Sequence, residues 1–236
     1  MKFIIILALA TVVGAAQSSV NTRPKVTAVV NAAHPKAGLA PGSIISIYGE
    51  NLAPLAATSA EPIHTARLNG TEVKICLQSA NLIYVSPGQI NAILFGAAYL
   101  WIGMECRVEV KTDVDSVTGD GRSSEIMWVP IVEEAWALFG SQLVPLITDV
   151  AGNPLGPDAP AIAGETVIGW GTGCKLFPAS LAVTINKPVK VNFAGPTPGS
   201  PGVCQVNFEV PADLPTGSHD LWVGGFKYTI WVGARK

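Results

Sequence analysis

The chain contains one set of sequence motifs twice, in the same order. This limits the chain to folds that can be built from two similar halves. Residues 41–49 (PGSIISIYG) recur as residues 163–171 (AGETVIGWG), 122 positions later. The tripeptide Gln-Ile-Asn at 89–91 recurs as Gln-Val-Asn at 205–207, 116 positions later. A period near half the chain indicates two tandem domains rather than a solenoid of many units.

Two weaker matches extend the pattern. Residues 68–75 match 184–191 at a spacing of 116, and residues 126–129 match 229–232 at a spacing of 103. The changes in spacing would fall in polar or proline-containing stretches, where loops tolerate insertions. We therefore predict an internal duplication, with one domain at 26–132 and a second at 133–236. A junction at 131–139 spans the boundary between these ranges and could form one or two helical turns.

The fold class follows from short β-branched runs separated by turn residues. The chain has 24 Gly and 18 Pro, and no stretch after the first residues keeps a helical 3.6-residue period over three turns. Asn69-Gly70 and Gly224-Gly225 lie between extended runs and predict tight hairpins. These features predict an all-β protein of two tandem immunoglobulin-like β-sandwiches.

The N-terminus resembles an export signal. Residues 1–16 combine Lys2, an apolar run of 11 residues at 3–13 and the small residues Gly-Ala-Ala at 14–16. The run is too short to cross a bilayer, which takes about 20 residues. We predict a signal peptide cleaved before Gln17, followed by a lead-in at 17–25 and an extracellular or periplasmic mature chain. The alternative is a buried N-terminal strand. No later segment is long and apolar enough to cross a membrane.

Export permits disulfides, and the chain has four cysteines. Cys76 and Cys106 fall in the first half, Cys174 and Cys204 in the second, and each pair is 30 residues apart. Three connectivities exist; we favour one bridge in each half, each closing a loop worth about 3.6 kcal/mol by the chain-entropy estimate. In the repeat alignment the two bridges occupy different positions. Four buried free thiols are the alternative.

Several motifs resemble one known family. VVNAA at 29–33, LAPGSIISIYGENLA at 39–53 and YVSPGQIN at 84–91 look like the Solibacter uncharacterised C-terminal domain of Acidobacteria, as does PGVCQVN at 201–207. That family usually ends large secreted proteins and its function is unknown. The pattern is also similar to IPT/TIG immunoglobulin-like domains. The resemblance implies a bacterial, secreted sandwich and supplies no catalytic residues. Residues 92–95 depart from it, because the family favours a proline there.

The sequence offers little chemistry. His34, His64 and His219 lie outside any catalytic motif, and no Gly-x-Ser-x-Gly elbow is present. The cysteines are too far from one another and from histidines for a zinc site. The acidic stretch 113–120 fails the EF-hand pattern, since its fifth position is Val117 and its twelfth is Ser124. A looser calcium site there is the alternative to an ordinary hairpin tip. We predict no catalytic residues, no metal and no cofactor.

The polar residues of most interest are two amide pairs, Gln89 with Asn91 and Gln205 with Asn207. Residues i and i+2 of a strand share a face. Each pair could therefore offer hydrogen bonds to sugar hydroxyls, or it could bond to the backbone of a neighbouring loop, which we favour. Of six tryptophans, the two candidates for exposed stacking are Trp101 and Trp222. Those at aligned positions, such as Trp128 and Trp231, are expected in a core or domain interface.

The low charge of the chain limits the classes of partner that it could bind. The formal net charge is −2 and only 14% of residues are charged, against about 25% in typical proteins. Such a surface has no electrostatic footprint for nucleic acid. We predict a secreted, non-catalytic structural or adhesive module that contacts other extracellular or envelope proteins. The alternative is a carbohydrate-binding module, and an enzyme is a weaker third reading.

Overall fold

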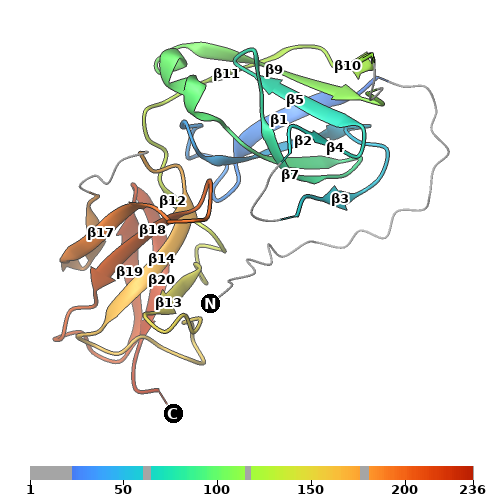
Figure 1. Ribbon diagram of the computed structural model, residues 1–236. Helices are drawn as coiled ribbons and strands as arrows, with labels where there is room; N and C mark the ends of the chain where they lie inside the picture. Colours follow the sequence, from blue (N-terminus) through green and yellow to red (C-terminus); the bar gives the residue numbers. More distant parts are fainter. Residues whose placement is uncertain (1–22, 61–64, 115–117, 176–180, 236) are drawn as a thin grey trace.

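The computed structural model describes residues 23–60, 65–114, 118–175 and 181–235. Almost all of its regular structure is β-strand, arranged as two sandwiches that lie one beside the other (Figure 1). The predicted all-β sandwich fold is confirmed. The predicted signal peptide at 1–16 and most of the lead-in at 17–25 lie outside the described residues.

The first sandwich consists of two antiparallel sheets. Sheet I has the order β1 (Lys25–Asn31), β2 (Ile44–Glu50), β8 (Gln89–Ile93), β7 (Asn81–Val85) and β3 (Ala57–Thr58). Sheet II has the order β10 (Arg122–Ser123), β9 (Glu105–Thr112), β5 (Thr71–Ile75) and β4 (Arg67–Leu68), with β11 (Met127–Pro130) also on β9 and β6 (Gln78–Ser79) also on β5. A 3-10 helix, η1 (Gly96–Trp101), connects β8 of sheet I to β9 of sheet II.

The second sandwich also has two antiparallel sheets. Sheet III has the order β12 (Ala137–Leu138), β14 (Thr166–Thr172), β18 (Cys204–Glu209) and β17 (Val191–Pro196), with β13 (Ile147–Asp149) also on β14. Sheet IV has the order β16 (Lys187–Pro188), β15 (Val183–Ile185), β19 (Gly217–Val223) and β20 (Phe226–Val232).

The two sandwiches share a strand order. In each, the strand carrying Gln-x-Asn lies between the strand that carries the first repeated motif and a strand with a bulge. After that bulge Tyr84 pairs with Asn91 in the first sandwich, and Phe193 pairs with Asn207 in the second. A bulge conserved at one register is a specific feature. The likeness is what an internal duplication would leave, and the duplication itself stays a prediction.

One pairing of the sequence repeat needs correction. Residues 68–75 were matched with 184–191, which equates the turns at Asn69 and Asn186. In the structure β5, which follows Asn69, pairs with β9, whereas β15, which precedes Asn186, pairs with β19. The two turns are therefore not equivalent. The first sandwich has a longer connection between β2 and β5, which includes β3 and β4. Its loop at 86–88 is shorter than the counterpart at 197–203. The length differences therefore still fall between the main strands.

The junction predicted to form helical turns is extended instead. Ala137 and Leu138 pair with β14, which uses their backbone groups in a sheet. Glycines permit this approach, because a Cβ at Gly171 would lie 2.0 Å from the Ala137 carbonyl oxygen. The prediction failed because the decisive partner is distant in sequence.

Each sandwich has its own apolar core. The first draws on residues between Leu39 and Ile131, and the second on residues between Trp136 and Val232. Tyr228 is buried in the second core, where its hydroxyl accepts a hydrogen bond of 2.9 Å from the Leu138 backbone N–H. Burial raises the pKa of this phenol above its usual value, so it stays protonated at neutral pH.

Both predicted disulfides are present, and the alternative of four free thiols is wrong. Cys76, after β5, bonds to Cys106 of β9 in sheet II. Cys174, after β14, bonds to Cys204 of β18 in sheet III. Each bridge links neighbouring strands of its own sandwich. The two occupy different positions of the repeat, as the alignment predicted, and they lie in sheets II and III respectively.

The sandwiches meet at one end of sheet I. Ile44 and Ile93 on its outer face pack with Phe139 and Val203 of the second half. The buried hydroxyl of Thr172 joins both sides, since it accepts the Ile44 N–H at 2.8 Å and donates to the Gly202 carbonyl at 2.6 Å. We call this contact the joint.

Replacing Thr172 by Val should weaken the joint. Valine keeps the shape but leaves the Ile44 N–H without its acceptor, which costs about 1–3 kcal/mol when the donor is buried. Chemical denaturation should show this loss. Thr112→Val is the control, because Thr112 is buried in β9 away from the joint, and it should cost less. Equal stability of Thr172→Val and the wild type would contradict the bridging role.

The C-terminus is held by an ionic clasp. The Arg235 guanidinium bonds to Asp149 Oδ2 at 3.0 Å, to Glu165 Oε1, and to the Pro160 carbonyl at 3.0 Å. Asn153 donates to the Asp149 carboxylate through its side chain and its backbone, both at 2.9 Å. The Asn153 side-chain bond is the largest cause that holds the pKa of Asp149 below its usual value, and Arg235 adds to it.

Asp149→Asn should destabilise the protein at pH 7 and progressively less in acid. A depressed carboxyl pKa stabilises the fold above the unfolded pKa, and this contribution is lost as pH falls through the folded pKa. The difference in melting temperature between wild type and variant should therefore shrink below about pH 4. Other carboxylates titrate in both proteins, so they cancel in the comparison. A difference that stays constant from pH 7 to pH 2.5 would refute the assignment.

Candidate functional site

The described histidines have structural partners. The ring of His34 packs on Phe226 across the joint, with ring centroids 4.2 Å apart. His219 Nε2 lies 2.8 Å from the Pro215 carbonyl oxygen. His64 lies outside the described residues. Neither described histidine is paired with a nucleophilic side chain, so neither forms part of a hydrolytic site.

Metal sites also lack support in the described part of the chain. No group of three His, Cys, Asp or Glu side chains there could hold an ion. Asp113, the first carboxylate of the acidic stretch, is paired with Arg122, and residues 115–117 lie outside the described residues. The first carboxylate of this stretch is therefore already engaged by a cation, and the looser calcium site stays a prediction.

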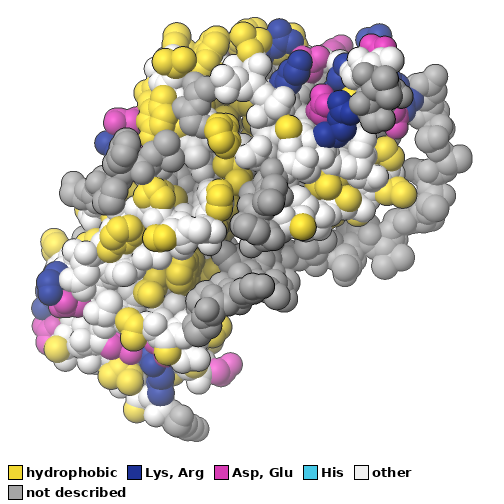
Figure 2. Space-filling view, in the orientation of Figure 1, with side chains coloured by type: hydrophobic (Ala, Val, Ile, Leu, Met, Phe, Trp, Pro, Cys, Tyr) yellow, Lys and Arg dark blue, Asp and Glu magenta, His cyan; other side chains and the backbone are white. Residues whose placement is uncertain are grey.

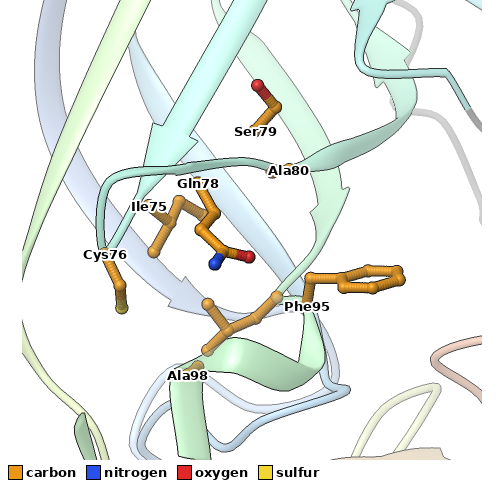
Figure 3. A pocket seen from close by; sticks show the side chains of 8 residues that line it. Ile75, Cys76, Gln78, Ser79, Ala80, Phe95 and Ala98 are labelled. Atoms are coloured by element: carbon orange, nitrogen blue, oxygen red, sulfur yellow. The ribbon is translucent and has the colours of Figure 1, made fainter. Parts of the chain in front are cut away.

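Enclosed cavities are small. The best-formed hollow lies between η1 and the turn after β5, and its volume is about 10 Å³, room for about one water molecule. In Figure 3 the Gln78 amide points into the space between the turn and η1, while the Phe95 ring extends away from the other lining residues. A second hollow beside Leu155 and Trp231 is equally small. Neither hollow has room for a sugar ring.

The most prominent surface feature is an apolar patch around the start of β9. Of eight large apolar side chains at least 50% exposed among the described residues, five gather there: Leu77 at 62%, Phe95 at 54%, Leu100 at 77%, Met104 at 50% and Trp128 at 57%. We call these five residues the η1 patch. Figure 2 shows hydrophobic side chains gathered at the upper left of the first sandwich, where Figure 1 places η1.

Local structure positions the η1 patch. Met104 directly precedes β9, and its carbonyl accepts the Ile131 N–H at 3.0 Å. Trp128 of β11 pairs with Arg107 of β9. Arg107 also accepts the Cys76 N–H at 3.1 Å through its carbonyl, which places the turn containing Leu77 beside β9. Backbone bonds and the Cys76–Cys106 disulfide therefore hold Leu77, Met104 and Trp128 around the start of β9, while Leu100 belongs to η1 and Phe95 is the residue before it.

The tryptophan predictions are mixed. Trp222 is 44% exposed on the outer face of sheet IV, as expected for a stacking residue. Trp101 instead packs against the first core. Trp128 was expected in a core or interface but is exposed, because its buried strand neighbours Val129 and Ile131 face inward. The alternation of β11 could have indicated this.

The amide pairs behave differently in the two sandwiches. Asn91 is buried, and its Oδ1 accepts from Ser46 Oγ at 3.0 Å and from Gln89 Nε2 at 2.9 Å. These partners are side chains of sheet I rather than the loop backbone that we favoured. In the second sandwich Asn207 Oδ1 is buried without a partner among the described residues, and Gln205 is half-buried.

No family model and no curated protein matches the chain. Among solved structures it is similar to the surface glycan-binding protein SGBP-B of the Bacteroides ovatus mixed-linkage glucan utilization locus, in complex with a mixed-linkage heptasaccharide (13% identity over 89% of this chain and 46% of that chain, TM-score 0.34).

Two further solved structures are similar to the chain, with lower TM-scores. They are the surface glycan-binding protein PbSGBP-B from Prevotella bryantii (12% identity, 89% of this chain, 41% of that chain, TM-score 0.29) and domains 4 and 5 of the S-layer protein SbsC (11% identity, 90% of this chain, 100% of that chain, TM-score 0.20). The chain spans less than half the length of the two glycan-binding chains. TM-scores of this size carry no argument about function.

Among the described residues, no helix has the length and apolar composition that crossing a bilayer requires.

The two amide pairs should differ in their contribution to stability. Asn91→Ala removes the acceptor for two side chains, one of them the buried Ser46 hydroxyl, and should cost about 1–3 kcal/mol. Gln205→Ala removes a half-buried side chain without such bonds and should change stability by about 0.5 kcal/mol or less. Urea denaturation of both variants measures this. A larger loss for Gln205→Ala would contradict the hydrogen-bond assignment.

Proposed function

We propose that the chain is a secreted, non-catalytic module that binds another extracellular or envelope protein through the η1 patch. One observation carries the proposal: five large apolar side chains, each at least 50% exposed, share one small region. Monomeric proteins rarely expose contiguous apolar patches larger than a few hundred Å², and patches of that size commonly mark interaction sites. The two disulfides support an oxidising compartment outside the cytoplasm.

The composition of the η1 patch favours a protein partner. Trp, Phe, Met and Arg are enriched at protein interfaces, and Trp and Arg are frequent hot spots. Trp128 pairs across the sheet with Arg107, whose guanidinium bonds to Glu109 at 2.9 Å. Glu105 starts β9 and is exposed. An apolar centre bordered by charged side chains is the usual arrangement of a protein-binding surface.

The scaffold lowers the cost of binding. The patch rests on β9, which pairs with β5, β10 and β11, and on the disulfide between Cys76 and Cys106. Side chains held in place before association lose less conformational freedom when a partner binds. This arrangement suits an adhesive or structural contact, and it requires no chemical step.

Charged substitutions in the η1 patch test this function. The double variant Leu100→Asp, Trp128→Asp should fold normally, because both side chains are exposed, and should lose partner binding because two charges would be desolvated in the complex. Capture of extracellular and envelope proteins on the immobilised chain, quantified by mass spectrometry, should fall at least about tenfold.

The matched control lies on the second sandwich. Leu143→Asp, Val150→Asp changes side chains that are 70% and 72% exposed, and it should capture the same proteins as the wild type. Melting temperatures identify any folding defect. Equal capture by the patch variant and the wild type would refute this function, and hydrolase activity intrinsic to the purified chain would show that the protein is not merely a binding module.

A further inference from the structure

The free end of sheet I carries a row of polar and aromatic side chains on its outer face. Successive side chains of a strand point to opposite faces of the sheet. Ile47 and Ile90 therefore point into the first core, and the residues on either side of each point outward. Tyr48 of β2 pairs directly with Gln89 of β8. The joint covers the other end of this face, at Ile44.

The next row across the sheet is also polar. Ser46 of β2 pairs with Asn91 of β8, and Asn91 pairs on its other side with Tyr84 of β7. Together with Tyr48 and Gln89 these residues cover four neighbouring positions around Asn91. We call the five residues the tyrosine–amide face.

Hydrogen bonds fix the two amides. Asn91 Oδ1 accepts from both Ser46 and Gln89, which sets the orientation of the Asn91 and Gln89 amide groups. Asn91 Nδ2 and Gln89 Oε1 then have no partner among the described residues. A donor and an acceptor held side by side match adjacent hydroxyls of a sugar ring, each of which both donates and accepts.

The tyrosines add apolar surface beside these groups. Tyr48 is 41% exposed and Tyr84 is half-buried. A tyrosine ring offers rigid apolar area with a polar tip, which suits the C–H face and the hydroxyls of a sugar. The other residues of the two rows are Ala28, Val30 and Thr58. These rows contain no charge, and the Lys25–Glu50 ion pair in the next row is neutral overall, so the face is complementary to an uncharged ligand.

The second sandwich provides an internal comparison. At the positions of Ser46, Tyr84 and Tyr48 its sheet III carries, respectively, Ile168, Phe193 and Trp170. Trp170 packs into the joint. Hydroxyls are therefore absent from the corresponding positions, and only the first sandwich keeps both the amides and the tyrosines.

We propose that the tyrosine–amide face binds a neutral oligosaccharide. The site lies on the opposite sheet from Trp128 of the η1 patch, and it does not rest on the function proposed above. Tyr48 would stack on a sugar ring, while Asn91 Nδ2 and Gln89 Oε1 bond to its hydroxyls. Asn91 and Ser46 are buried, whereas Tyr48, Gln89 and Tyr84 are exposed or half-buried, so the ligand would lie over the two tyrosines and Gln89 and reach Asn91 through its Nδ2.

Calorimetric titration tests the site. The probes are hexasaccharides of β-1,4-glucan, β-1,3-glucan, β-1,4-xylan and β-1,4-mannan, with an oligogalacturonate as the charged comparison. We expect at least one neutral probe to bind with a Kd of about 1 mM or tighter, and the charged probe to bind more weakly. Tyr48→Ala and Gln89→Met should each weaken binding about tenfold, while Tyr48→Phe should weaken it less.

Controls separate the two proposals. Trp222→Ala, on sheet IV, and the η1 patch double variant should bind the oligosaccharide like the wild type. Melting temperatures show whether Tyr48→Ala folds, and Gln89→Met keeps the test valid if it does not. Absence of binding to every neutral probe overturns the proposal, as does binding that Tyr48→Ala and Gln89→Met leave unchanged. Equal binding of the oligogalacturonate overturns the assignment of a neutral ligand.

Discussion

The contact between the two sandwiches decides which surfaces of the protein are free. The start of β2 and the end of β8 pack against the second half, and the Thr172 hydroxyl bridges Ile44 and Gly202 there. Burying this end of sheet I uses the apolar side chains that would otherwise be exposed on its outer face. The opposite end of the same strands, with Tyr48 and Gln89, is left outside the joint.

The two sheets of the first sandwich offer different chemistry for one reason. Successive side chains of a strand alternate between core and surface, so each sheet has one outer face whose character is set by every second residue. In sheet I the two rows at Tyr48 and Asn91 carry no charge and hold several hydroxyl groups, and the Lys25–Glu50 ion pair lies in the next row at the end of the sheet. In sheet II it carries charged side chains such as Arg107 and Glu109, and the η1 patch lies at its end. The two proposed binding surfaces therefore lie on opposite sheets of one sandwich.

The sequence was enough to predict the sandwich fold and the main hairpins, because these depend on local composition. It was also enough to predict both disulfides, because each half contains two cysteines and a domain that folds as a unit pairs its own cysteines. Prediction from the sequence failed at residues 131–139, where pairing with distant β14 makes the chain extended. It also misjudged Trp101 and Trp128. Repeat alignment cannot tell which face of a strand points inward, whereas the register with β9 does.

The sequence by itself determined that the chain folds as β-sandwiches with a charge-poor surface and two amide pairs, since these follow from residue types and their spacing. Only the tertiary structure decided which amide pair remains available. Gln89 and Asn91 lie beside Tyr48 and Tyr84 through cross-strand pairing, while Trp170, the counterpart of Tyr48, packs into the joint. Cross-strand register and the contact between the halves join residues far apart in the chain, and no local pattern encodes them.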